Sequence, residues 1–272
     1  MIEFLKAVLF GIIEGITEWL PVSSTGHLIL LEEVLRLNVS EAFYELFQVV
    51  IQLGAIFAVL VLFFHKLWPF SKKKTVTERK NTWTLWFKVI VAVLPSAILG
   101  LLFDDFLDEH LYNNIVVALM LILYGIVYLL VERSALDPKI TDVHAIDYRT
   151  ALFIGAFQCL SLIPGTSRSG ATILGALMLG VSRSAGAEFS FFLAIPTMLG
   201  ASALKLLKFL LEGNLPTQNE LVILAVGCVT AFVISILVIR SLMDFVRKHS
   251  FAPFGIYRIV LGAAVLGRFL LR

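Results

Sequence analysis

The amino-acid sequence predicts an all-α polytopic membrane protein with about six transmembrane helices, two re-entrant helical hairpins and an inverted-topology internal repeat. The chain of 272 residues is 59% hydrophobic and 15% charged, whereas soluble domains are about 25% charged. Several apolar runs approach the ~20 residues that cross a bilayer. Two further apolar stretches are interrupted by Gly, Pro and Ser at matching positions.

Six apolar runs are long enough to be transmembrane spans. They cover roughly 44–64, 85–103, 113–131, 187–211, 220–240 and 252–271. We expect one integral membrane domain over residues 1–272, with repeat 1 at about 1–131 and repeat 2 at about 145–272. The two cysteines lie in apolar surroundings without metal-ligand spacing. The net charge of +2 is too small to indicate a nucleic-acid partner.

The charges of the connections predict the orientation of the spans. Residues 65–88 are rich in Lys and Arg and hold one acid, Glu78, so this connection is expected on the cytoplasmic side. The acidic connection 104–109 has no Lys or Arg and is expected outside. Alternation then places 132–149 inside, 212–219 outside and both termini outside.

Two apolar stretches, 1–37 and 150–182, remain outside the six spans. Interrupted segments are tolerated at membrane depth only where they face protein or water. We therefore predict that both are re-entrant helical hairpins. The alternative for residues 1–20 is a plain span or a surface helix.

The two stretches match without gaps at an offset of 144 residues. Gly11, Glu14, Thr17, Ser23, Thr25, Gly26 and Ile29 fall on Gly155, Gln158, Ser161, Ser167, Ser169, Gly170 and Ile173. Three predicted spans separate the stretches, and an odd number reverses direction, so the halves are expected to have inverted topology. Paired broken segments of this kind predict a site at the midplane, between the repeats.

Each interrupted stretch offers a helix N-terminus for an anion. The candidate capping residues are Ser23, Ser24 and Thr25 in the first stretch and Thr166, Ser167 and Ser169 in the second. Free N–H groups and the helix dipole at such an end favour a phosphate. Arg168 adds a planar guanidinium that matches phosphate oxygens.

The first stretch also carries groups for phosphoryl chemistry. Glu14 and Glu18 are four residues apart and share one helix face, and ionisable groups at membrane depth indicate function. Ser24 could attack phosphorus with His27, one turn further on, as base, or His27 could itself be the nucleophile. Glu18 could orient His27, act as base or hold a divalent cation.

Other charged residues are expected to have supporting roles. Arg183 and Glu188 are candidates for a pair that supports Arg168, or for interfacial positions. The remaining histidines lack converging polar partners and are expected to be solvated. They are His65, His110, His144 and His249.

At these residues the chain resembles the undecaprenyl-pyrophosphate phosphatase family, also called the bacitracin-resistance proteins. The motifs are EGITEWLPVSSTGH (14–27) and PGTSRSGAT (164–172), supported by FQVVIQLGAI (47–56), VSRSAGAEFSF (181–191) and PFGIYR (253–258). The resemblance covers essentially the whole chain and shows no departure at the motif positions.

The resemblance implies hydrolysis of undecaprenyl pyrophosphate to undecaprenyl phosphate, the carrier lipid for peptidoglycan, and thereby bacitracin resistance. It implies a multi-pass protein of the bacterial cytoplasmic membrane, with the site on the outer side and a divalent cation, Mg²⁺ or Ca²⁺. The implied catalytic residues are Glu14, Glu18, Ser24, His27 and Arg168, with Glu14 and Glu18 as candidate metal ligands. Substrate contacts are expected at Ser23, Thr25, Gly165, Ser167, Ser169 and Thr172.

A transporter or flippase for an anion or a phospholipid-like substrate is the alternative function, because inverted repeats with broken helices are typical of transporters. Release of phosphate from a prenyl pyrophosphate would distinguish the enzyme from the transporter. The sequence is also compatible with a homodimer.

Overall fold

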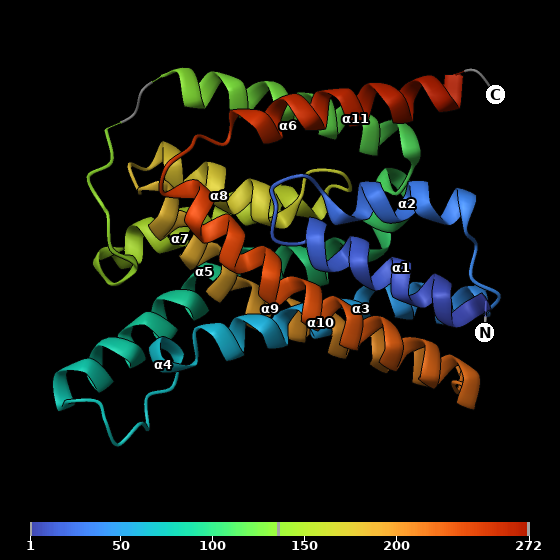
Figure 1. Ribbon diagram of the computed structural model, residues 1–272, viewed down its shortest axis with the longest axis horizontal. Helices are drawn as coiled ribbons and strands as arrows, with labels where there is room; N and C mark the ends of the chain where they lie inside the picture. Colours follow the sequence, from blue (N-terminus) through green and yellow to red (C-terminus); the bar gives the residue numbers. More distant parts are fainter. Residues whose placement is uncertain (1, 135–136, 271–272) are drawn as a thin grey trace.

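The computed structural model describes residues 2–134 and 137–270, and its regular structure there is helical (Figure 1). The helices are α1 (Ile2–Thr17), α2 (Ser24–Val34), α3 (Glu41–Leu62), α4 (Phe64–Leu67), α5 (Val76–Leu111), α6 (Asn114–Arg133), η1 (Val143–Ala145), α7 (Tyr148–Cys159), η2 (Leu160–Leu162), α8 (Arg168–Met178), α9 (Arg183–Leu211), α10 (Gln218–Val246) and α11 (Ala252–Leu270). One isolated parallel bridge joins Ile140 and Val181. The all-α prediction is confirmed.

Six of these helices are long and apolar enough to cross a membrane. They are α3, α5 over Val76–Phe103, α6, α9, α10 and α11 over Ala252–Phe269, at the six predicted places. The helices of the two interrupted stretches are shorter, with 16 and 11 residues in α1 and α2 and 12 and 11 in α7 and α8. None of these four reaches the ~20 residues of a span.

One predicted connection is helical instead. Residues 104–109 lie inside α5, which continues to Leu111. The charged residues end the apolar run, but the segment contains neither Gly nor Pro, so nothing in its backbone ends the helix. The connection to α6 is therefore only Tyr112 and Asn113.

Both interrupted stretches fold as a helix, a break and a second helix. Ser23 accepts the N–H of Gly26 and caps α2 (3.4 Å), and Ser167 accepts the N–H of Gly170 and caps α8 (3.1 Å). Both caps are among the predicted ones. In Figure 1, α2 and α8 lie nearly end to end across the middle of the molecule, with the two breaks between them. Re-entry into the membrane and the inverted relation of the halves stay predictions.

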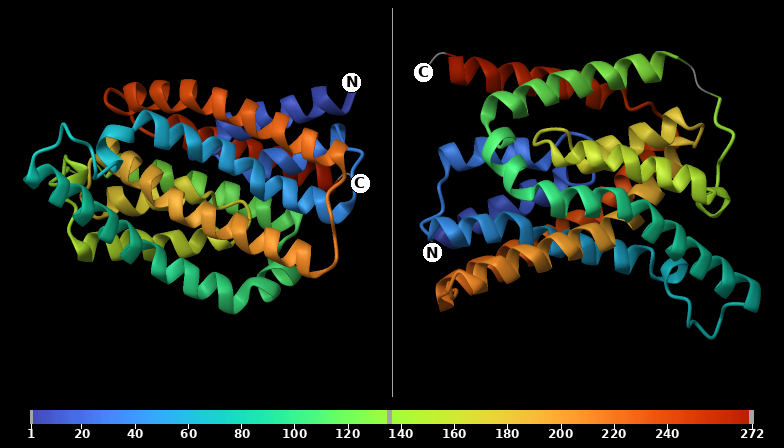
Figure 2. Two further views of the ribbon diagram at one scale, coloured as in Figure 1. Left: turned by 90° about the horizontal axis from the view of Figure 1, so that it is seen from below. Right: turned by 180° about the vertical axis from the view of Figure 1, so that it is seen from behind.

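Helices of the first half pack on helices of the second. α1 packs on α10, α7 on α5, α3 on α9 and α6 on α11, and Figure 2 shows α6 and α11 side by side along one edge. Matching glycines allow two of these contacts: an added Cβ at Gly11 would lie 2.6 Å from the Gly227 carbonyl oxygen, and one at Gly155 would lie 2.0 Å from that of Ala92. This packing brings the two breaks together.

Candidate active site

The helix that follows each break starts with a residue suited to phosphoryl chemistry. Ser24 is the first residue of α2 and Arg168 the first of α8, at the offset of the repeat. Each follows a serine with positive φ, 70° at Ser23 and 73° at Ser167, the only such non-glycine residues among those described. Backbone strain of this kind costs about 1–3 kcal/mol and clusters at functional sites.

Glu18 joins the two halves at this point. The Ser24 hydroxyl donates to Oε2 of Glu18 at 2.8 Å, and Nη2 of Arg168 donates to Oε1 at 2.9 Å. Glu18 is 5% exposed and Ser24 is 8% exposed, so water screens these contacts little. The structure thus assembles three of the predicted catalytic residues from two segments about 150 residues apart.

Arg168 is fixed from several sides. Its Nη1 donates to the Ser190 carbonyl oxygen (2.8 Å) and contacts the Ser190 hydroxyl (3.3 Å), and its Cζ lies 5.8 Å from the centre of the Trp19 ring. Its buried Nε has no acceptor among the described residues. The guanidinium is therefore held in orientation with one N–H group unsatisfied.

Glu14 is fully buried, and neither of its carboxylate oxygens has a donor among the described residues. Its counterpart in the repeat, Gln158, is equally buried but donates to the Ser96 hydroxyl at 2.6 Å and to that of Thr197 at 3.2 Å. An unpaired buried polar group is costly. Glu14 therefore carries a free-energy cost of burial that Gln158 avoids through its hydrogen bonds. This difference indicates a role of Glu14 in function.

The carboxylates of Glu14 and Glu18 fit a small hard cation. They lie one turn apart, since the N–H of Glu18 donates to the Glu14 carbonyl oxygen at 3.0 Å. The described part of the chain has no group of three or more His, Cys, Asp or Glu side chains arranged for a metal. Mg²⁺ often takes only one or two protein carboxylates, with phosphate and water as its other ligands.

His27 is not hydrogen-bonded to Ser24 in the structure. Its Nδ1 contacts the Ser23 carbonyl oxygen at 2.7 Å and its Nε2 contacts the Tyr257 hydroxyl at 2.6 Å, with the two rings stacked at 5.6 Å. Because a carbonyl oxygen only accepts, Nδ1 carries a proton, and in the neutral ring Nε2 accepts from Tyr257. The structure therefore does not show the pairing of His27 with Ser24, and its catalytic role stays a prediction.

The other predicted contact residues bind the protein itself. The Ser169 hydroxyl contacts the carbonyl oxygens of Glu18 (3.0 Å) and Leu20 (3.1 Å), and Thr172 contacts the Arg168 carbonyl oxygen (2.9 Å) and the Ser190 hydroxyl (2.7 Å).

Ser23 and Ser167 act as helix caps, and Thr25 is half-buried. Gly165 has φ 89° with its backbone close to Val117. These side chains and this turn shape the breaks, and their contact with a substrate stays a prediction.

Two residues of α11 at the site had no predicted role. Tyr257 contacts His27, and Arg258 is fully buried and donates to carbonyl oxygens of both breaks. Both lie in the PFGIYR motif. The sequence did contain a signal for Arg258, because an arginine inside an apolar span indicates a functional role. Its partners could not be predicted, because they are distant in the sequence.

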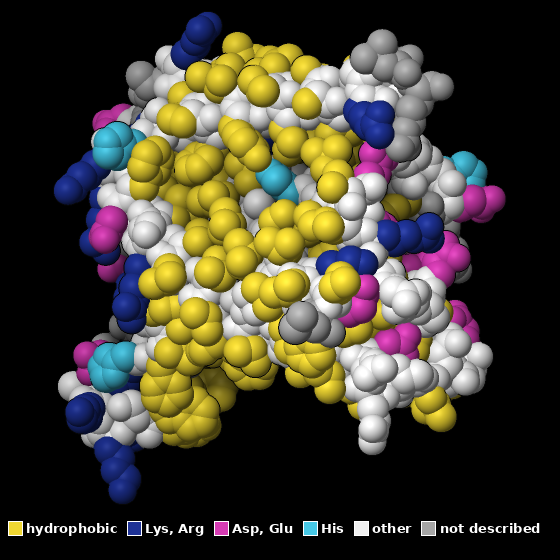
Figure 3. Space-filling model, turned by 45° about the vertical axis from the view of Figure 1, so that its right-hand side comes forward, with side chains coloured by type: hydrophobic (Ala, Val, Ile, Leu, Met, Phe, Trp, Pro, Cys, Tyr) yellow, Lys and Arg dark blue, Asp and Glu magenta, His cyan; other side chains and the backbone are white. Residues whose placement is uncertain are grey.

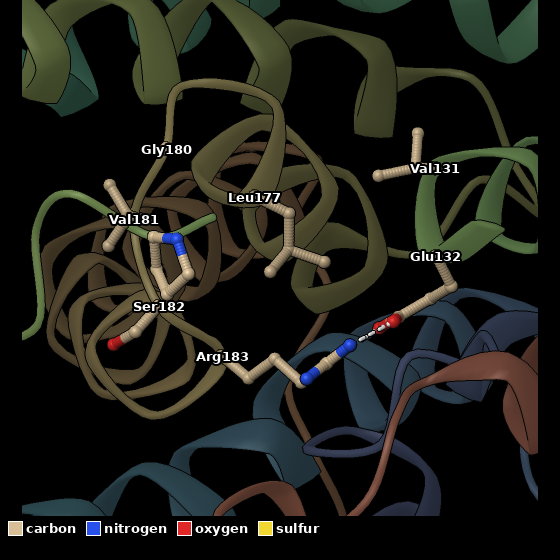
Figure 4. Close-up of a pocket in the computed structure, with 8 residues that line it drawn as sticks. Val131, Glu132, Leu177, Gly180, Val181, Ser182 and Arg183 are labelled. Atoms are coloured by element: carbon tan, nitrogen blue, oxygen red, sulfur yellow. Dashed lines mark hydrogen bonds and ion pairs between the residues drawn. The ribbon is translucent and has the colours of Figure 1, made fainter. Parts of the chain in front are cut away.

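Of the two alternatives for Arg183 and Glu188, the mutual pair that would support Arg168 is not found. Arg183 pairs with Glu132 of α6, beside the small pocket that Figure 4 shows, and Glu188 pairs with Lys66 at 2.6 Å. Residues five apart on a helix point to different faces, so each finds a partner on another segment.

The remaining histidines are mostly solvated, as expected. His65, His110 and His249 are exposed. His144 in η1 is half-buried, and burial lowers the pKa of its imidazole.

Comparison with known proteins extends over almost the whole chain. Residues 7–264 match the family model described as "Bacitracin resistance protein BacA". The chain is 55% identical to an undecaprenyl-diphosphatase of Enterococcus faecalis over 97% of both chains, and 56% identical to one of Latilactobacillus sakei over 98% of both. It is also 56% identical to undecaprenyl-diphosphatase 1 of Clostridioides difficile, over 100% of this chain and 98% of the relative.

Proposed function

This chain belongs to the bacitracin resistance protein BacA family, and we propose that it hydrolyses undecaprenyl pyrophosphate to undecaprenyl phosphate and inorganic phosphate. The buried chain of hydrogen bonds from Ser24 through Glu18 to Arg168 is the observation that carries this proposal. It joins a hydroxyl, a carboxylate and a guanidinium between apolar helices, and these groups would suit the roles of nucleophile, base and phosphate-binding cation. The relatives are named undecaprenyl-diphosphatases, which supports undecaprenyl pyrophosphate as the substrate of this chain.

Ser24 is the nucleophile in this proposal. Its hydroxyl already donates to Glu18 (2.8 Å), so Glu18 takes its proton as Oγ attacks the terminal phosphorus in line. The bond from phosphorus to the bridging oxygen breaks, and undecaprenyl phosphate leaves. Water then attacks the phosphoserine, Glu18 returns the proton to Oγ, and inorganic phosphate leaves.

Arg168 and the helix ends hold the phosphoryl group. The unsatisfied Nε–H of Arg168 and the N-termini of α2 and α8 supply donors and positive charge where the transition state carries negative charge. Because Ser190 fixes the guanidinium, little reorganisation is needed on substrate binding.

A divalent cation, Mg²⁺ or Ca²⁺, is part of the proposal. Glu14 and Glu18 would hold it, and when bound it would neutralise phosphate charge. The two unpaired oxygens of Glu14 support this assignment.

The substrate's tail would stay in the lipid while its head enters the site. Around His27, the neighbouring α11 exposes Ile256 (56%) and Tyr257 (46%). Figure 3 shows hydrophobic side chains gathered over the middle of one side of the molecule. We propose that the tail lies along this face, in a bacterial cytoplasmic membrane with the site open to its outer side. Residues 65–88, at the start of α5, are rich in Lys and Arg, whereas residues 104–109 near its end have none, and this difference supports the orientation.

Phosphate release from undecaprenyl pyrophosphate by the purified protein in detergent tests the function. Phosphate release by the wild-type protein, together with its loss in Ser24→Ala, would support the proposed enzymatic activity. Lipid or anion movement across liposomes without phosphate release would support the transporter or flippase instead.

A homodimer stays a proposal, which the mass of the detergent-solubilised particle tests.

A further inference from the structure

The PFGIYR motif of α11 places one buried cation between the two breaks. Arg258 is fully buried. Its Nη1 donates to the Pro21 carbonyl oxygen at 3.1 Å, and its Nη2 donates to those of Gly165 and Thr166, both at 2.9 Å. Pro21 belongs to the first break, and Gly165 and Thr166 belong to the second.

The partners of this arginine are unusual for a buried charge. Buried cations are normally paired with a carboxylate. Among the described residues, the hydrogen bonds of Arg258 all go to backbone carbonyl oxygens, and its Cζ lies 5.7 Å from the Tyr124 ring. Its charge is therefore used to hold backbone rather than to neutralise an acid.

The held backbone directly precedes the reactive residues. Pro21 lies three residues before Ser24, and Thr166 lies two before Arg168. Between them are Ser23 and Ser167 with their strained positive φ, which persists only where surrounding contacts fix it.

We propose that Arg258 is a positioning residue that fixes the two breaks relative to each other and so sets the distance between Ser24 and Arg168. The proposal rests on the proposed function, because it acts through those two residues. Two guanidinium nitrogens serve the two breaks at once. A lysine offers its donors from a single nitrogen and cannot reproduce this bridge.

Arg258→Lys and Arg258→Gln test the proposal against a matched control, Lys88→Gln. Lys88 is also a buried cation (8% exposed) that donates to a backbone carbonyl oxygen, that of His144 at 2.8 Å, away from the breaks. The readouts are kcat and KM for phosphate release, and backbone hydrogen exchange over residues 18–26 and 163–170. The exchange measurement needs no activity.

We expect Arg258→Lys to lower kcat by about 100-fold with little change in KM, since small misplacements of reacting groups have effects of this size. Exchange should become faster in both breaks together. Lys88→Gln should keep kcat and the exchange of both breaks at wild-type values.

Three outcomes would overturn the proposal: wild-type kcat in Arg258→Lys, faster exchange in one break or in neither, or an equal loss of kcat in Lys88→Gln. If Arg258→Gln fails to fold, Arg258→Lys decides. If the wild-type protein releases no phosphate, the proposed function fails, while the exchange data still decide whether Arg258 joins the breaks.

Discussion

At the scale of single residues, the structure favours Ser24 over His27 as the nucleophile. Ser24 donates to a carboxylate, whereas both ring nitrogens of His27 are engaged by Ser23 and Tyr257. The sequence could not decide this question, because Tyr257 lies 230 residues from His27.

Ser24→Ala is expected to lower kcat for phosphate release by at least about 10³-fold, the scale at which nucleophile removal acts. His27→Ala should retain clearly more activity, because its ring is not bonded to the nucleophile. Rate measurements on both variants decide between them, and an equal or larger loss in His27→Ala would contradict the assignment.

Arg168→Lys should reduce kcat by about 10²-fold, the usual effect of removing one transition-state donor. Lysine cannot both contact Ser190 and Glu18 and present a further N–H group to phosphate. The matched control is Arg133→Lys at the exposed end of α6, which should keep full activity. Near-normal turnover in Arg168→Lys would remove Arg168 from the mechanism.

Glu14→Gln should raise the unfolding temperature in the absence of divalent cations, because it replaces a buried carboxyl group that has no donor among the described residues, and an unsatisfied buried polar group costs roughly 1–3 kcal/mol. It should also weaken activation by Mg²⁺. The reciprocal variant, Gln158→Glu, should lower stability, since it loses the donor to Ser96 and Thr197. Thermal unfolding with and without Mg²⁺ measures both effects, and a less stable Glu14→Gln with unchanged Mg²⁺ activation would exclude the cation role.

At the scale of secondary-structure elements, the sequence predicted those features that depend on neighbouring residues in the chain. Hydropathy located the six spans, and the serine positions located the caps of α2 and α8. It missed the helical end of α5, because the loss of hydropathy after Phe103 is not a loss of helix. It did not find the partner of Arg183, since Glu132 lies on another helix.

The contact of α7 with α5 depends on Gly155. Gly155→Ala should lower stability by about 1–3 kcal/mol, because its Cβ would meet the Ala92 backbone. Gly200→Ala is the control: it is an exposed helical glycine with no atom near an added Cβ, so stability should stay level or rise. Chemical unfolding of both variants tests this, and equal stabilities would show that α7 does not need the close approach.

At the scale of the whole molecule, the residues of the candidate site come together where the two halves of the chain meet. Glu14, Glu18 and Ser24 come from the first half, and Arg168 and Arg258 come from the second. The internal match at an offset of 144 predicted a site between the repeats. The sequence alone could not predict the bridge through Arg258, because backbone carbonyl partners leave no side-chain signal.

Mass spectrometry of the quenched enzyme during a single turnover of undecaprenyl pyrophosphate tests the central claim most directly. The account predicts a phosphate on the peptide containing Ser24, lost as inorganic phosphate appears, and absent from Ser24→Ala. A phosphate on His27, or inorganic phosphate released with Ser24 unmodified at every time point, would contradict it.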